Sequence, residues 1–213
     1  MSVFELFSAP MGTPGNALLN WSDPAASNII SYAHSYRSAA MNLVAFREQR
    51  GDFTIDDGAL PIVFLYRHAF ELYLKAIVYR AAMLTINEED LRQAIPRLWR
   101  EHSLVRLVKM AEPTLVSSIR LWLQSGELHR KIAALAVKLD EVDPGSYSFR
   151  YPVTSYGNPA LPTNVMLNIF VFSEAMEQVL DDVAQVCRIL QDEDLRASDQ
   201  MKLALHPIAS GAV

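Results

Sequence analysis

The amino-acid sequence predicts an all-α fold, a helical bundle of roughly four to six helices with one long ordered loop. Apolar residues recur at steps of three and four along most of the chain, and glycine and proline interrupt that spacing at only a few places. The composition, with 51% hydrophobic and 20% charged residues in a chain of 213, is that of one globular domain. We expect an extended lead-in over residues 1–20, the bundle over residues 21–192 and a mobile tail over residues 193–213.

The first helix is predicted to begin at Ser22 or Asp23 and to reach about Glu48. Either side chain can accept hydrogen bonds from the free amides of a first helical turn, and Pro24 suits the first helical position. The apolar stripe of this helix consists of Ile29, Ala33, Tyr36, Ala40 and Leu43.

A longer helix is predicted over residues 60–84, after an acidic turn over residues 51–58. Nearly all of its residues are apolar, and a helix without a clean polar face belongs at the centre of a bundle. Its polar interruptions are Arg67, His68, Glu71, Lys75 and Arg80.

Shorter helices are predicted next, over residues 87–95, 102–110, 113–122 and 127–139. Acidic residues open the first of them, where the helix dipole favours negative charge, and Pro96 is expected to end it. The last two are expected to form a pair around the turn at Ser125 and Gly126.

Residues 143–162 combine prolines and glycines with several aromatic residues. Aromatic side chains in a long loop need a surface on which to pack, and such loops frequently carry function. We therefore predict an ordered loop rather than a flexible linker. Its aromatic residues are Tyr147, Phe149, Tyr151 and Tyr156.

The last helix is predicted over residues 162–192, with its start at Pro162 and Thr163. Apolar residues form a heptad seam along its full length, which is typical of a helix packed against partners. These partners are either the other helices of the same chain or a second copy of the chain in a symmetric dimer. The seam consists of Val165, Ile169, Phe172, Met176, Val179, Val183, Val186 and Leu190.

Charge and composition exclude several classes of protein. The formal net charge of −5 excludes a broad basic surface, so any RNA contact has to come from a local basic site. The single cysteine, Cys187, excludes an internal disulfide and a thiolate zinc cluster, and its helical setting favours a buried apolar role. No signal-peptide pattern opens the chain, and the apolar stretch 59–66 is far too short to cross a bilayer. We expect a cytoplasmic protein without membrane contact, cofactor or metal.

Four polar residues of the predicted central helix are candidate functional residues. Arg67, Glu71 and Lys75 follow at helical intervals and share one stripe, and His68 lies beside it. Two cations, a carboxylate and a histidine on an apolar helix are costly to bury unless they pair or line a cleft. Two interpretations remain open. Either Glu71 bridges both cations in a structural network, with His68 bonded to a backbone carbonyl, or the four side chains line a binding cleft.

A second polar cluster lies in the predicted loop. Asp143 and Ser146 are candidates to cap a turn, and Arg150 is a candidate to pair with Asp143 or with Glu71. His102 is predicted to help start a helix. These placements are structural, and a role of Arg150 in binding phosphate remains open beside them.

Three segments carry motifs that belong together. They are Arg67-His68-Ala-Phe-Glu71-Leu-Tyr-Leu-Lys75, then His102-Ser-Leu-Val-Arg-Leu, then Asp143 through Phe149-Arg150-Tyr151-Pro152. In this order they resemble the RHAxELxLK helix, the HxLxxL helix and the D…FRYP loop of a bacterial branch of the HEPN superfamily. The resemblance covers most of the bundle and implies an α-helical protein that commonly dimerises and uses a cleft on RNA or nucleotides.

Many members of that superfamily are metal-independent endoribonucleases of toxin–antitoxin or phage-defence systems. The active ones carry an arginine, usually followed by a polar residue, and a histidine a few positions further along. In such chemistry a histidine moves the proton of the 2′-hydroxyl or of the leaving oxygen, while an arginine holds the phosphate. The resemblance implies catalytic roles for His68, His102 and Arg67, phosphate contacts by Arg67, Lys75 and Arg150, and orientation by Glu71 and Asp143.

The sequence departs from this pattern where the spaced histidine is expected, because Leu72, Tyr73 and Leu74 stand there. Arg97 and His102 have the formal spacing, although a proline directly precedes the arginine. Two functional hypotheses follow. The first is a HEPN-like RNA- or nucleotide-binding protein, expected to be a homodimer, in which cleavage would depend on one of the two candidate histidines. The second is a non-catalytic helical interaction module that holds a cognate protein partner.

Overall fold

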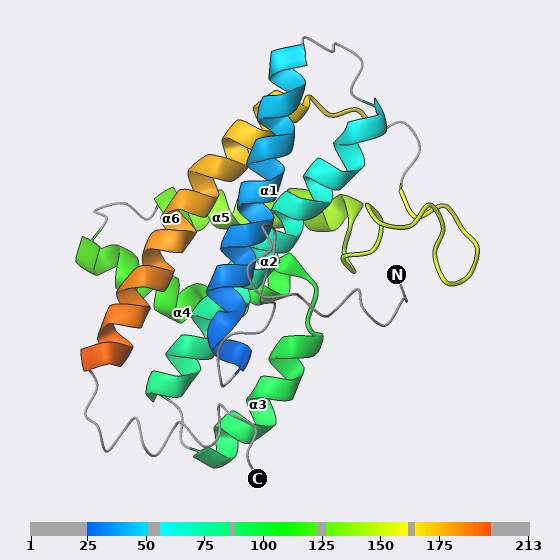
Figure 1. Ribbon diagram of the computed structural model, residues 1–213. Helices are drawn as coiled ribbons and strands as arrows, with labels where there is room; N and C mark the ends of the chain where they lie inside the picture. The colour runs from blue at the N-terminus through cyan, green and yellow to red at the C-terminus, as the bar shows by residue number, and fades with distance from the viewer. Residues whose placement is uncertain (1–24, 51–55, 86–87, 123–126, 162–164, 197–213) are drawn as a thin grey trace, which may run out of the picture.

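The computed structural model describes residues 25–50, 56–85, 88–122, 127–161 and 165–196. Within these ranges the chain forms six α-helices, which confirms the predicted all-α bundle (Figure 1). The predicted lead-in over residues 1–20 lies outside the described residues, as does most of the predicted tail over residues 193–213; residues 193–196 belong to the last helix, so the tail was predicted to begin too early. The elements are η2 (Ala25–Asn28, a 3₁₀ turn), α1 (Ile29–Arg50), α2 (Asp56–Thr85), α3 (Glu88–Arg100), α4 (Leu104–Trp122), α5 (Glu127–Val142) and α6 (Ile169–Arg196).

Helix α2 is the centre of the bundle, as its apolar sequence predicts. It packs against α1, α3, α4 and α6, and α4 packs against α5. Figure 1 shows α1, α2 and α6 running side by side, with α4 and α5 behind them. The side chains of Phe70, Leu74 and Ile77 on α2 are fully buried. Among the described helices, none combines the length and the apolar character that crossing a bilayer requires.

Helix α6 begins at Ile169 because Asn168 caps it. The Oδ1 atom of Asn168 accepts hydrogen bonds from the amides of Phe170 and Val171, each at 3.1 Å. The predicted start at residues 162–163 lies outside the described residues, but residues 165–168 are not helical, so this helix begins later than predicted, and Val165 precedes it with 48% of its surface exposed. The rest of the seam faces the interior of the same chain, with Phe172 half-buried and these residues buried: Ile169, Met176, Val179, Val183, Val186 and Leu190.

Two prolines lie inside helices that they were predicted to interrupt or begin. Helix α3 continues through Pro96, and α4 runs without interruption through Pro113, so the predicted end at residue 95 and the predicted separate helices over 102–110 and 113–122 are wrong. A proline removes a backbone donor and leaves the carbonyl one turn earlier without its partner. Both prolines lie on an exposed face, where water can bind that carbonyl.

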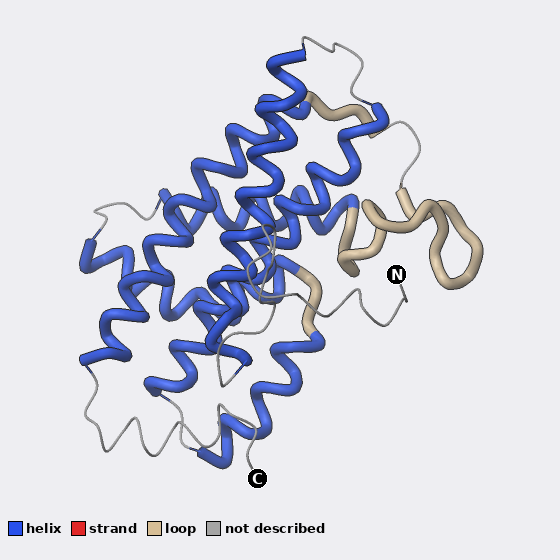
Figure 2. The backbone as a smooth tube through the Cα atoms, viewed as in Figure 1, coloured by secondary structure: helices blue, strands red, loops and turns tan. Residues whose placement is uncertain are grey.

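Residues 143–161 form the predicted ordered loop, which projects from the bundle beyond α5 (Figure 2). Its base is fixed by Asp143, because the Oδ1 atom of this residue accepts the amides of Tyr147 and Ser148, each at 2.8 Å. Phe149 packs against the core of the bundle. Asp143 therefore caps the turn as predicted, and Ser146 occupies the left-handed region with φ of 59°.

Candidate functional site

Arg67, Glu71 and Lys75 form a buried ion-pair network on α2. Their exposed fractions are 0%, 1% and 4%. The Oε2 atom of Glu71 accepts a hydrogen bond from Nη1 of Arg67 at 2.7 Å, and Oε1 accepts one from Nζ of Lys75 at 2.8 Å. Glu71 thus bridges both cations, as one of the two interpretations of the stripe predicts.

The same two cations also donate hydrogen bonds to backbone carbonyls outside α2. The Nη2 atom of Arg67 donates to the backbone carbonyls of His102 at 2.7 Å and of Asp143 at 3.1 Å. The Nε atom of Arg67 donates to the Asp143 carbonyl and lies 3.0 Å from the carboxylate atom Oδ2, an ion-pair contact. Lys75 donates to the carbonyl of Trp99 at 3.2 Å. The rigid fork of an arginine suits this task, because it offers several donors in fixed directions.

Charge balance explains how these groups tolerate burial. The charges of the buried cations Arg67 and Lys75 are balanced by the buried carboxylates of Glu71 and Asp143, and the carboxylate of Asp140 lies 3.8 Å from Arg67 at the edge of the cluster. Burial by itself raises the pKa of Glu71, but the hydrogen bonds and charges of Lys75 and Arg67 outweigh burial and lower that pKa. Glu71 is therefore ionised at neutral pH.

His102 is the exposed histidine next to this network. It lies in the junction between α3 and α4, and 51% of its side chain is exposed. Its Nδ1 atom lies 2.9 Å from Oε1 of Glu71, which leaves Nε2 on the opposite edge of the ring. Glu101 fixes the junction, because its Oε1 atom accepts the amides of His102 and Ser103 at 3.0 and 2.9 Å. The buried carboxylate of Glu71 thus sets the orientation of the solvent-accessible imidazole of His102.

His68 has different surroundings. Its ring stacks on Phe64 with centroids 5.5 Å apart and meets the edge of Tyr36 at 4.5 Å. Its Nδ1 atom is buried and has no hydrogen-bond partner among the described residues, so this nitrogen does not make the predicted bond to a backbone carbonyl. Burial lowers the pKa of His68, and the nearby cations lower it further against the opposing charge of Glu71. His68 is a neutral member of an aromatic stack.

Arg150 lies at the surface, on the loop. Its Nε and Nη2 atoms donate to the backbone carbonyl of Ser146, and its guanidinium lies 5.4 Å from the ring centroid of Phe64 and 5.5 Å from that of Tyr151. These contacts replace the predicted pairing with a carboxylate. Its remaining nitrogen, Nη1, donates to none of the residues that the structure describes.

Asp140, near the end of α5, is a structural residue that the sequence interpretation missed. Its carboxylate accepts the amides of Leu104 at 3.0 Å and Val105 at 2.9 Å and the hydroxyl of Ser103 at 2.7 Å, so it caps α4 from a neighbouring helix. It also lies 3.8 Å from Nη2 of Arg67. The sequence holds one signal for this role: an acid in the last turn of a helix opposes the helix dipole and therefore needs a partner elsewhere.

A further buried cation, Arg37 on α1, was also missed. Its guanidinium pairs with Glu177 and Asp181 on α6 and so ties these two helices together. Only 11% of its side chain is exposed. The arginine stands within the predicted apolar stripe of α1, between Tyr36 and Ala40, and such a position favours a buried partner of opposite charge.

The predicted site residues therefore divide into two groups. Arg67, Glu71, Lys75 and Asp143 make up the buried network, and His102 joins it from the surface. Arg150 and His68 lie together around Phe64, apart from the ion pairs. Because Arg67 and Lys75 already donate to protein atoms, phosphate contacts by these two residues remain predictions that require the network to open.

No protein-family model matches the chain, and neither the curated proteins nor the solved structures contain a significant match. The resemblance to the HEPN superfamily therefore remains a prediction, and functional inference for this protein rests on its own residues.

Proposed function

We propose that this chain is a HEPN-like RNA- or nucleotide-binding protein whose contact surface centres on His102. The supporting observation is the contact between Nδ1 of His102 and the buried carboxylate of Glu71 at 2.9 Å, with half of the imidazole exposed. A carboxylate on one ring nitrogen holds the ring in one orientation, and the other nitrogen is then available to a ligand.

The surroundings of His102 supply the local basic site that an acidic protein needs for RNA. Residues 97–109 carry four cations and one carboxylate, Glu101, in a chain of net charge −5. Exposed cations that flank a junction in the sequence can attract phosphate even when the whole protein repels it. The cations, all exposed, are Arg97, Arg100, Arg106 and Lys109.

In this proposal Arg67 and Lys75 are positioning residues. They hold Glu71 beneath His102 and hold the carbonyls of the α3–α4 junction in place. They need not touch the ligand to matter for binding, since loss of either changes where His102 lies.

Binding is the primary activity in this proposal, and cleavage is secondary. To cleave RNA, His102 would take the 2′-hydroxyl proton, the 2′-oxygen would attack the adjacent phosphorus, and a second acid would protonate the leaving 5′-oxygen. His68, the other histidine considered for this role, is held in an aromatic stack with a buried Nδ1 atom. The described residues therefore offer one exposed imidazole at the proposed surface.

The test is incubation of the protein with labelled single-stranded and structured RNA in the absence of divalent metal. We expect salt-sensitive binding that Arg100→Ala weakens and that Arg188→Ala, an exposed change on α6, leaves intact. Each lost phosphate contact should reduce the slope of log K against log salt by about one. Cleavage that His102→Ala removes and that the exposed control His34→Ala retains would add nuclease activity. RNA that is neither bound nor cut would refute the proposal.

A second candidate function is the non-catalytic interaction module, and exposed aliphatic residues favour it. A groove of about 430 Å³ beside the start of α6 is lined by Leu60, Val165 and Leu167 and by Met166, which is 96% exposed. Apolar surface of this kind commonly marks protein contacts, including contacts in homodimers. Light scattering over a concentration series would test self-association, and Met166→Glu should lower it without affecting folding.

A further inference from the structure

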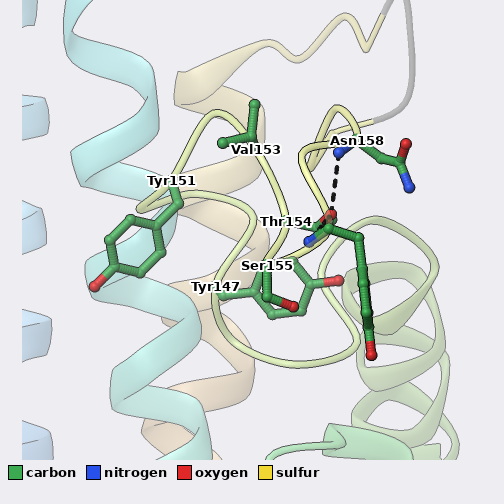
Figure 3. A pocket seen from close by; sticks show the side chains of 7 residues that line it. Tyr147, Tyr151, Val153, Thr154, Ser155 and Asn158 are labelled. Carbon is green, nitrogen blue, oxygen red and sulfur yellow. Dashed lines mark hydrogen bonds between the residues drawn. The ribbon is translucent and has the colours of Figure 1, made fainter.

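The ordered loop encloses a cleft outside the surface assigned above. The cleft has a volume of about 690 Å³ and is lined by three tyrosines, Tyr147, Tyr151 and Tyr156. Figure 3 shows the loop wrapped around it, with Tyr151 directed away from Tyr147 and Ser155. This volume lies within the range usual for small-molecule sites.

Backbone hydrogen bonds fix the tip of the loop. The amide of Thr154 donates to the carbonyl of Asn158 at 2.8 Å, and the amide of Gly157, which has φ of 78°, donates back to the carbonyl of Thr154 at 2.9 Å. An isolated bridge also joins Val153 to Pro159. A loop held in this way loses little conformational entropy when a ligand binds.

Two of the tyrosines are presented to solvent on this fixed backbone. Tyr156 is 89% exposed and Tyr151 is 56% exposed. Large aromatic side chains on a rigid exposed loop are poorly placed to stabilise the core and well placed to stack on a planar ligand.

Besides the tyrosines and Val153, the lining of the cleft is polar and uncharged. Thr154, Ser155 and Asn158 supply hydroxyl and amide groups, which can donate and accept hydrogen bonds at a base edge. No acidic residue is among the described residues that line it. The guanidinium of Arg150 lies over the ring of Tyr151, and its Nη1 atom, which donates to none of the described residues, suits an anion.

We propose that this cleft binds a nucleobase of a single-stranded RNA, with an adjoining phosphate on Arg150. The proposal rests on the proposed function and names where a base is held. Aromatic faces, base-edge donors and acceptors and a neighbouring cation together match a nucleotide. An apolar peptide would find one aliphatic lining residue, Val153, and a basic peptide would meet Arg150.

The cleft and the surface around His102 are joined through Arg67. The Nη2 atom of Arg67 donates hydrogen bonds both to the carbonyl of His102 and to the carbonyl of Asp143, which lies at the base of the loop. This shared contact fixes the α3–α4 junction relative to the base of the loop, and in this proposal one strand of RNA contacts both.

The first arm of the test compares two fluorescently labelled probes of equal length, a single-stranded oligoadenylate and its abasic counterpart. Tyr151→Ala and Tyr156→Ala should each weaken oligoadenylate binding by about 5- to 100-fold, because a stacked base is worth on that order. They should leave the abasic probe unchanged. Tyr156→Phe keeps the stacking face and should bind almost as the wild type does, and Tyr32→Ala on α1 serves as the control.

The second arm titrates adenosine 5′-monophosphate and follows tyrosine ring signals by NMR. Saturable shifts at Tyr151 and Tyr156, without a shift at Tyr32, support the base site even if the protein binds no RNA. RNA binding that Arg100→Ala weakens, combined with no effect of the tyrosine variants and no ring shifts, would overturn the base site and leave the proposed function standing. Equal weakening of the abasic probe would also overturn it.

Discussion

Replacement of Arg67 by methionine is the most direct test of the buried network. The substitution keeps an unbranched side chain at a position that is 0% exposed, but it removes the positive charge. Glu71 then keeps its bond to Lys75, whereas the Asp143 carboxylate loses its contact with the guanidinium and the carbonyls of His102 and Asp143 lose a donor. Breaking a buried ion pair by removing one partner costs about 3–5 kcal/mol, because the remaining charge stays buried.

Urea unfolding at neutral pH, followed by circular dichroism, measures this loss. We expect the free energy of unfolding to fall by about 3–5 kcal/mol and the melting temperature by roughly 6–20 °C. Arg67→Lys keeps the positive charge but lacks the forked guanidinium, so its free energy of unfolding should lie between those of Arg67→Met and the wild type. Arg188→Met, an exposed control, should change stability by less than about 0.5 kcal/mol. A loss below about 1 kcal/mol in Arg67→Met would show that the network is not an essential buried ion pair.

Three further predictions concern single side chains. Asp140→Ala should destabilise the protein by about 1–2 kcal/mol in urea unfolding, because the first amides of α4 lose their cap, whereas the exposed neighbour Glu141→Ala should not. His68 has a lowered pKa when folded, so the unfolded chain binds its proton first and the free energy of unfolding should fall as pH drops below about 6.5. His68→Phe should remove this dependence of the free energy of unfolding on pH, and an unchanged dependence would contradict its assignment to His68. The pKa of Glu71 is also lowered, but Glu71 affects the free energy of unfolding only below about pH 4.5. Cys187 is fully buried and its pKa is raised to about 12, so a thiol reagent should modify it in denaturant and leave it intact in the native protein.

Most of the fold could be predicted from the sequence because apolar spacing directly reports which face of a helix is buried. The central position of α2 follows from its lack of a polar face. The errors have local causes. Pro96 was expected to end one helix and Pro113 to begin another, yet both lie inside helices, on exposed faces where a helix tolerates them. The start of α6 was misplaced because the Pro-Thr pair resembles a helix start, while Asn168 provides the cap.

The candidate site was predictable only in part. Helical spacing alone places Glu71 between Arg67 and Lys75, and the bridge between them follows. Spacing does not reveal the backbone carbonyls of His102 and Asp143, because these arrive from distant segments. The seam of α6 shows the same limit: Val179 is buried within its own chain, so Val179→Glu would report on folding rather than on association. A homodimer remains a prediction, and its interface would have to form on a surface other than the seam of α6.

The contact between Arg67 and Asp143 also has a consequence for how the chain is made. The two residues are 76 positions apart, so the ribosome completes α2 long before the partner of its central arginine exists. Until Asp140 and Asp143 emerge, the nascent helix carries a guanidinium that lacks two of its three carboxylate partners. Helix α2 therefore cannot settle into its final surroundings during early synthesis, and assembly of the bundle has to wait for the end of α5. Truncation of the chain before residue 143 should yield a species that collapses without native packing.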